Sequence, residues 1–290
     1  MKLAQNVLNP MRGLKSLNFQ VSYSFSNFSN TGGAQVNGTP GDSDQDFVLQ
    51  SADNDHPGRY YGPGLLDRTH QISFGGFADV PLGFRVGLIG HFYSPLSTAI
   101  VIPSSGGAGE IFLSDFTGDG TTQDPMPGTK FGQFGRKTDV HGLINLINNY
   151  NANIAGTPTP AGQSVVGAGL MSASQLVSLG GVPQQVPLPP DGQVPFTWLR
   201  TMDLKLSWRR TFKERFTIEP SVGFYNLLNF ANFNLPPSVM SSLLTGPGTG
   251  TINGTSRVDD TLTQFRVGNG TGVYSLGAQR QIEFGMRFEF

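Results

Sequence analysis

The chain has 290 residues, of which only 13% are charged, and its net charge is −1. This balance excludes the basic surface that nucleic-acid binding requires, and the absence of cysteine excludes a disulfide framework or a thiolate site. No apolar stretch approaches the roughly 18 residues of a transmembrane helix, so the low charge favours an extracellular β-rich protein or an outer-membrane β-barrel.

The first segment, "MKLAQNVLNP", has one lysine and no apolar core, so it is not a signal peptide. Residues 3–13 indicate the last few residues of a strand and a turn. Residues 16–28 then alternate strictly, with Leu17, Phe19 and Val21 separated by polar residues. A period of two places the apolar side chains on one face of a β-strand.

Four further strands are predicted along the chain. Residues 70–80 and 84–92 alternate around the turn "VPLG", and residues 202–208 and 216–224 alternate around the charged turn "FKER". Two such runs around a Pro/Gly or polar turn are typical of a hairpin. The chain ends in "EFGMRFEF", where apolar and polar residues alternate to the last position.

About six strands plus a remnant result, each near the 9–11 residues that cross a membrane at a tilt. Tight turns alternate with three long connections, roughly 29–68, 96–198 and 227–276. Short periplasmic turns and long extracellular loops alternate in this way in outer-membrane barrels. The predicted fold is all-β, an antiparallel up-and-down transmembrane β-barrel portion, with residues 1–290 as the C-terminal portion of a larger barrel that needs at least about eight strands to close.

A β-sandwich with one solvated face is the alternative fold. A structureless connection of roughly 100 residues is rare in a compact domain and argues against it. The second long connection contains two helical patterns. One is an apolar stripe over residues 143–154, and the other is a capping box of Ser172 and Gln175 with a stop at Gly180. We expect short helices with a local core, packed over the barrel mouth.

The sequence shows no catalytic motif, and we expect no enzyme and no cofactor. His70 and His91 are interpreted as polar wall residues. A barrel-type outer-membrane hydrolase is the alternative, and it requires one of these histidines within hydrogen-bond reach of a serine and a carboxylate.

One loop has the spacing of half a calcium site. Asp115, Thr117, Asp119 and Asp124 stand at positions one, three, five and ten, with glycine at six and methionine instead of an acid at twelve. An Asp/Gly-rich turn explains the same residues. The sequence favours the turn and leaves calcium open.

The terminal "EFGMRFEF" resembles the signal by which outer-membrane barrels are recognised for assembly, through Glu283, Gly285, Phe288 and Phe290. Three internal stretches extend the resemblance: "DRTHQISFGGFADVPLGFRVGLIGHFYSPL", "TGDGTTQDPMPGTKFGQFGR" and "EPSVGFYNLLNFANF". Together they resemble the C-terminal barrel region of Oar-like TonB-dependent receptors.

That resemblance implies a Gram-negative outer-membrane transporter or receptor. Its partners would be membrane lipids, the barrel assembly machinery, and the missing plug and N-terminal barrel part, which reach the TonB complex. The family's signal peptide, TonB box and plug are not found in residues 1–290, so this portion alone is expected to be inactive in transport. An outer-membrane or secreted β-rich adhesion or binding protein is the alternative function.

Overall fold

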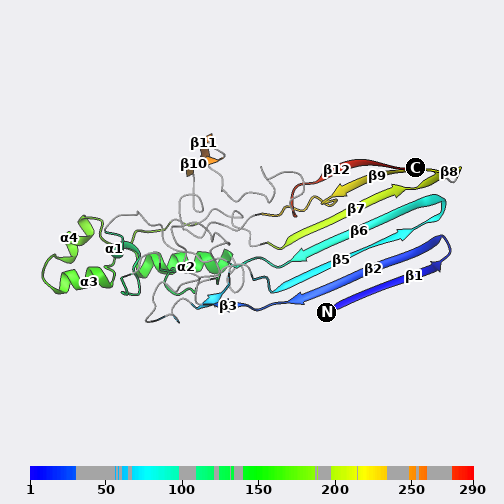
Figure 1. The fold of residues 1–290 in the computed structure, drawn as a ribbon. Coiled ribbons are helices and arrows are strands. Elements are labelled where there is room, and N and C mark those ends of the chain that lie inside the picture. The colour runs from blue at the N-terminus through cyan, green and yellow to red at the C-terminus, as the bar shows by residue number, and fades with distance from the viewer. Residues whose placement is uncertain are drawn as a thin grey trace.

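One antiparallel sheet of eight strands dominates the structure (Figure 1). The computed structural model describes residues 1–30, 56, 58, 61–64, 67–97, 109–120, 124–130, 132–133, 140–186, 188, 197–213, 215–233, 248–252, 255–259 and 276–290. Within these residues, no helix is both long enough and apolar enough to cross a membrane. The all-β, antiparallel character predicted from the alternation is therefore confirmed.

The sheet follows the chain up and down in the order β1-β2-β5-β6-β7-β9-β12, with the short β8 paired to β9. Its strands are β1 (Lys2–Met11), β2 (Leu14–Phe25), β5 (His70–Asp79), β6 (Phe84–Tyr93), β7 (Leu199–Trp208), β8 (Arg210–Phe212), β9 (Phe216–Tyr225) and β12 (Gln281–Glu289). The first strand is ten residues long, so the predicted remnant is wrong: β1 pairs with β2 along most of its length. Two small ladders, β3 (Ser29–Asn30) with β4 (Gly62–Pro63) and β10 (Gly248–Ile252) with β11 (Thr255–Asp259), were not predicted.

The tight turns of the main sheet lie at one end of the strands, and the long connections lie at the other (Figure 1). At the tight-turn end, Gly83 adopts φ 88°, and a Cβ there would collide with the Arg209 carbonyl. In return the Arg209 N–H donates to the Gly83 carbonyl at 2.8 Å, and the Trp208 indole donates to the Leu82 carbonyl at 2.9 Å. These bonds fix the β5–β6 hairpin against the end of β7.

The strand register gathers the apolar side chains on one face, which we call the apolar face. Directly opposed residues of antiparallel strands share a face. Val21 is opposite Phe74, Leu88 is opposite Leu204, and Leu204 is opposite Phe224. By the same pairing, residues far apart in sequence share this face: Phe19, Tyr23, Phe74, Phe84, Leu88, Leu204, Trp208, Ile218, Phe224, Phe284 and Phe288. The alternation therefore gave the face of every one of them correctly.

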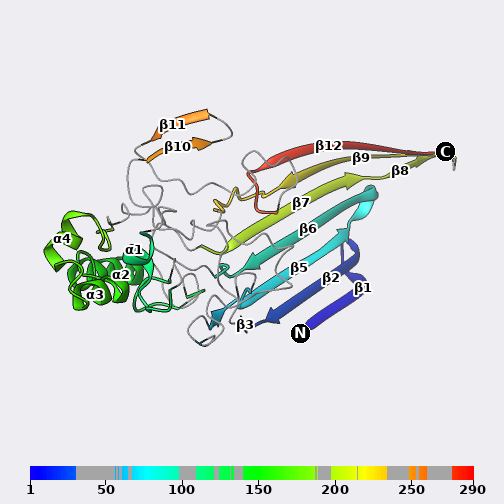
Figure 2. The same ribbon diagram turned by 60° about the vertical axis from the view of Figure 1, so that its left-hand side comes forward.

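The sheet is open. The strands β1 and β12 form its two edges and lie on opposite sides of it (Figure 2). Between these edges, β2, β5, β6, β7 and β9 are each paired on both sides, and the short β8 is paired to β9 alone. Closure into a barrel is therefore not part of the described structure.

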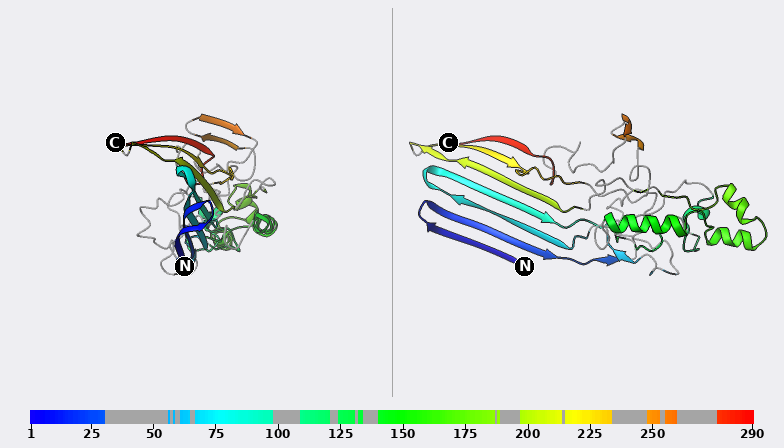
Figure 3. Two further views of the ribbon diagram at one scale, coloured as in Figure 1. Left: turned by 90° about the vertical axis from the view of Figure 1, so that its right-hand side faces the viewer. Right: turned by 180° about the vertical axis from the view of Figure 1, so that it is seen from behind.

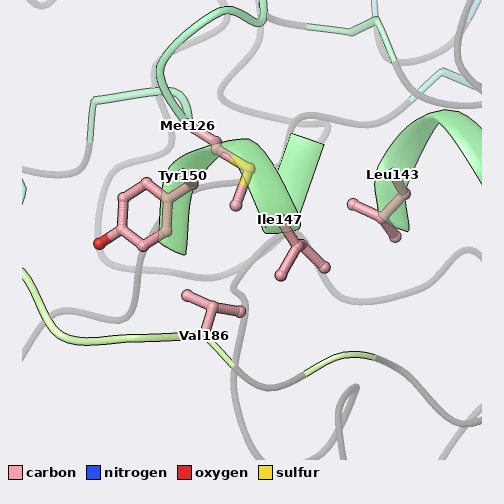
Figure 4. Close-up of a cluster of buried hydrophobic side chains, with 5 residues drawn as sticks. All are labelled: Met126, Leu143, Ile147, Tyr150 and Val186. Atoms are coloured by element: carbon pink, nitrogen blue, oxygen red, sulfur yellow. The ribbon is translucent and has the colours of Figure 1, made fainter. Parts of the chain in front are cut away.

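The second long connection contains four helices, α1 (Ile111–Ser114), α2 (Val140–Asn153), α3 (Pro160–Gly167) and α4 (Ala173–Ser178), which we call the helical lobe. Both helices predicted there are confirmed. The stripe on α2 forms a local core, in which Leu143, Ile147 and Tyr150 are buried with Met126 and Val186 (Figure 4). The α4 helix begins at Ser172 with the predicted capping box.

The helical lobe extends away from the strands, beyond the ends that carry the long connections (Figure 3). The sequence led us to expect these helices over the mouth of a barrel, and since the described sheet is open, that placement stays a prediction. The core of α2 lies within the lobe itself. It therefore needs no contact with the strands to be buried.

Candidate functional site

The face opposite the apolar face carries a row of hydrogen-bonding side chains across adjacent strands. Ser73 of β5 is opposite His91 of β6, and His91 is opposite Thr201 of β7. Tyr93 stands two residues beyond His91 on the same face, and the Arg68 guanidinium lies over the Tyr93 ring at 5.9 Å. We call Arg68, Ser73, His91, Tyr93 and Thr201 the polar-face cluster.

Three members of this cluster form a closed triangle of contacts. The Ser73 Oγ lies 3.0 Å from His91 Nδ1 and 3.0 Å from the Tyr93 hydroxyl, and that hydroxyl lies 3.0 Å from the same Nδ1. The imidazole and phenol rings are 5.6 Å apart. Since all three polar atoms converge on one point, the triangle fixes the rotamers of His91 and Tyr93.

Thr201 differs from its neighbours because its hydroxyl has no hydrogen-bond partner within the described part of the chain. Only 2% of the residue surface is exposed, and among the described residues the Oγ1 makes no hydrogen bond. A buried hydroxyl without a partner costs about 1–3 kcal/mol. The sheet thus presents a spare hydrogen-bonding group directly beside His91.

Arg68 is the cationic member of the cluster. It is half-buried, and it donates one hydrogen bond to the Ser94 carbonyl. Burial lowers the pKa of Arg68 because desolvation disfavours its charge. Within the described part of the chain, no carboxylate pairs with this guanidinium.

A hydrolase would need a carboxylate in this cluster as well as the serine–histidine contact. Asp203 is the nearest acid along β7, two residues after Thr201, but its Oδ1 accepts the backbone N–H of Asn226 at 2.7 Å. The structure therefore contains the serine–histidine contact of the hydrolase alternative, between Ser73 and His91. Among the described residues, no carboxylate contacts His91 to orient it. The absence of enzymatic activity stays a prediction.

His70 does not have the position expected of a polar wall residue. It lies on the apolar face, opposite Phe25, where its Nδ1 contacts the Tyr23 hydroxyl at 2.9 Å. Its ring stacks on Trp198 with a centroid distance of 6.1 Å and an interplanar angle of 4°. The alternation would have placed it correctly, because His70 is in phase with Ile72 and Phe74.

Aromatic side chains form two bands on the apolar face, one near each end of the strands. The band at the long-connection end consists of Tyr23, Phe25, His70 and Trp198. The band at the tight-turn end consists of Phe84, Trp208, Phe212, Phe216, Phe288 and Phe290. Sequence reasoning identified the apolar face and missed the two bands, although the spacing of the only two tryptophans could have indicated them.

The four residues of the terminal signal lie on both faces of β12. Phe288 and Phe290 pack on Phe216, with ring centroids 6.1 and 5.4 Å away, within the tight-turn band. Glu283 accepts a hydrogen bond from the Tyr225 hydroxyl on the polar face. Gly285 is opposite Ser221, whose Oγ would lie 2.8 Å from an added Cβ. The strand ends at Glu289, one residue before Phe290, and the role of these residues in assembly stays a prediction.

The aspartates of the candidate calcium loop are engaged with the backbone. Asp115 accepts the N–H groups of Gly118 and Gly120, and Asp124 accepts those of Phe116 and Thr117. Both carboxylates are buried, while Thr117 contributes its backbone rather than its hydroxyl to these bonds. Among the described residues, no three acidic or histidine side chains are grouped to hold a metal ion. This geometry is that of an Asp/Gly turn, and calcium at Asp115, Thr117, Asp119 and Asp124 gains no support from it.

Two buried asparagines of the "NLLNFANF" stretch tie three strands together, a role that the sequence did not reveal. Asn232 accepts the Arg200 N–H at 2.7 Å and donates to the carbonyls of Arg200 and Gly277. Asn226 donates to the Ala278 carbonyl and receives the Phe230 N–H. The end of β9 is thereby fixed to the starts of β7 and β12.

Comparison of the chain with protein-family models, with curated proteins and with solved structures found no match.

Proposed function

We propose that this sheet is part of the wall of an outer-membrane β-barrel, in a transporter or receptor of the Oar-like TonB-dependent class. The apolar face contacts lipid, and the opposite face lines the lumen. The proposal rests on one observation above all: an uncovered apolar face bounded by an aromatic band at each end.

The distance between the bands fits a membrane. Trp198 lies in one band and Trp208 in the other. They stand at the two ends of β7 and are ten residues apart in the chain. At about 3.4 Å per residue and a tilt of about 40°, ten residues span about 26 Å along the membrane normal. Outer-membrane barrels have an apolar zone of about 25 Å between aromatic girdles.

The apolar face exposes large hydrophobic side chains, which a face in contact with water does not normally do. Phe284 is 83% exposed, Phe25 63% and Ile282 55%. Soluble monomers rarely leave contiguous apolar surface of this kind uncovered. A sandwich would bury it under a second sheet, and the described residues contain only two small ladders besides the main sheet.

The open edges require further strands under this proposal. Unpaired backbone groups in hydrocarbon cost several kcal/mol each, so β1 and β12 must both be paired in a membrane. The remainder of a larger barrel supplies those strands. Energised transport then depends on a plug and the TonB complex, and the barrel assembly machinery recognises the ordered terminal strand through Phe288 and Phe290.

The two tryptophans provide the test. In the larger barrel reconstituted in vesicles, we expect the fluorescence contributed by Trp198 and Trp208 to be quenched by lipids that carry bromine near the headgroup, and much less by lipids brominated at the chain ends. The single variants Trp198→Phe and Trp208→Phe assign the signal to each band. Both must behave alike, because both bands lie at an interface.

A control tryptophan belongs in the helical lobe. Leu179 is 72% exposed there, so Leu179→Trp in a chain without the other two tryptophans should be quenched by aqueous iodide and not by brominated lipid. Absence of lipid quenching at both Trp198 and Trp208, in protein that retains its β-sheet circular dichroism, would refute the membrane proposal.

A further inference from the structure

We propose that the polar-face cluster binds a carboxylate group of a small solute, with Arg68 as the cation, the Thr201 hydroxyl as a donor, and Ser73 and Tyr93 holding His91 in place beside it. The inference concerns the face that the proposed function assigns to the lumen, and it deepens that function by naming the chemistry of a ligand. The binding chemistry itself does not depend on the presence of a membrane.

Arg68 gives the first reason. A guanidinium has five N–H donors, and among the described residues only the Ser94 carbonyl accepts from Arg68. A half-buried cation has lost hydration, and among the described residues the Ser94 carbonyl and the Tyr93 ring replace only part of it. A planar carboxylate matches the two parallel donors of a guanidinium and supplies the missing charge.

The neighbouring side chains give the second reason. The triangle of Ser73, His91 and Tyr93 holds the phenol and the imidazole at 5.6 Å, so their positions are fixed before a ligand arrives. Next to His91, the buried Thr201 hydroxyl has no partner among the described residues. Side chains held in fixed positions beside a cation without a carboxylate partner among the described residues are typical of a prepared binding site, since little side-chain entropy remains to be lost.

The surrounding charges select one negative charge rather than two. Arg68 is the single cation of the cluster, and Asp203 stands on the same face two residues beyond Thr201. A phosphate dianion would meet one positive group and this nearby carboxylate. A monocarboxylate is balanced by Arg68 alone.

The experiment uses butyrate as the probe and butyramide as its uncharged analogue, with binding measured by saturation-transfer NMR on the protein in vesicles. We expect butyrate to bind and butyramide not to bind. Arg68→Gln should weaken butyrate at least about tenfold, because it removes a charge-assisted bond. Arg210→Gln removes an exposed arginine outside the cluster and should leave the affinity unchanged.

Thr201→Val provides a variant that does not threaten the fold. It keeps the side-chain shape and removes a hydroxyl that has no bond to lose in the described structure, so stability should hold or rise. Butyrate affinity should nevertheless fall about threefold. Unchanged affinity in both Arg68→Gln and Thr201→Val, equal loss in Arg210→Gln, or stronger binding of inorganic phosphate than of butyrate would each overturn the inference.

The tryptophan quenching separates the two proposals. Normal lipid quenching of Trp198 and Trp208 together with no butyrate binding would remove only the carboxylate site. Butyrate binding with the expected variant pattern, in protein that shows no lipid quenching, would remove only the membrane proposal.

Discussion

Replacing Asn232 by alanine should remove the hydrogen bonds that connect the segment after β9 to β7 and to the segment before β12, a connection that we call the joint. Asn232 is 1% exposed and satisfies three backbone groups, the N–H and carbonyl of Arg200 and the carbonyl of Gly277. Each buried polar group left without a partner costs about 1–3 kcal/mol. Taking the lower end for all three, Asn232→Ala should lower the free energy of unfolding by about 3 kcal/mol.

The assay is urea unfolding followed by tryptophan fluorescence, with Asn229→Gly as the matched control. Asn229 is exposed, adopts φ 50° and accepts a single 3.3 Å bond from the Arg280 N–H. Glycine tolerates that φ, so the control should cost less than about 1 kcal/mol.

Asn232→Asp separates the bonds of the joint from one another. It keeps an acceptor for the Arg200 N–H and lacks the donor for the two carbonyls. Hydrogen exchange of the Arg200 amide should therefore accelerate in Asn232→Ala and stay slow in Asn232→Asp. If Asn232→Ala were no more destabilising than Asn229→Gly, the reasoning from buried backbone groups would be wrong.

Three further predictions follow from the two faces and from the helical lobe. Phe19→Arg on the apolar face should cost about 2–4 kcal/mol of stability in vesicles, whereas Gln20→Arg on the opposite face should be mild, as measured by urea titration. Burial raises the pKa of Tyr150 to about 12 from an ordinary value of 10.0. Between pH 10 and pH 12 only the unfolded chain loses this proton, so the unfolding free energy of the lobe should fall as pH rises through that range. In melts recorded at several pH values, Tyr150→Phe should remove this dependence. Loss of both Phe288 and Phe290 from the protein should reduce its recovery in outer-membrane fractions, and unchanged recovery would contradict the assembly role.

The features that could be predicted from the sequence are those set by residues close together in the chain. The period of two assigned faces correctly for residues such as Phe74 and Leu204, since facing is a local property of a strand. The capping box at Ser172 was readable for the same reason. The cluster around His91 was not, because it depends on the register that sets Ser73, His91 and Thr201 side by side. No spacing within one strand specifies that register.

The two asparagines show the same limit at longer range. The partners of Asn232 lie 32 and 45 residues away in the chain, and they are backbone groups of β7 and of the segment that precedes β12. The first strand was underestimated for a related reason. Its alternation is weak, with Gln5 in line with Leu3 and Val7, so its length became evident only through pairing with β2.

The low charge of the chain acquires a physical reason under the membrane proposal. Half of each strand faces hydrocarbon and must be uncharged, so charges are confined to the other face and to the strand ends. The described ion pairs fit this division: Asp79–Arg85, Arg209–Glu289 and Arg287–Glu289 all lie near the tight-turn end. Arg68 stands apart from these pairs, at the opposite end of the strands and without a carboxylate partner among the described residues. In a chain that has so few charges, a guanidinium without a carboxylate partner among the described residues, next to the polar-face cluster, fits the carboxylate ligand proposed for that face.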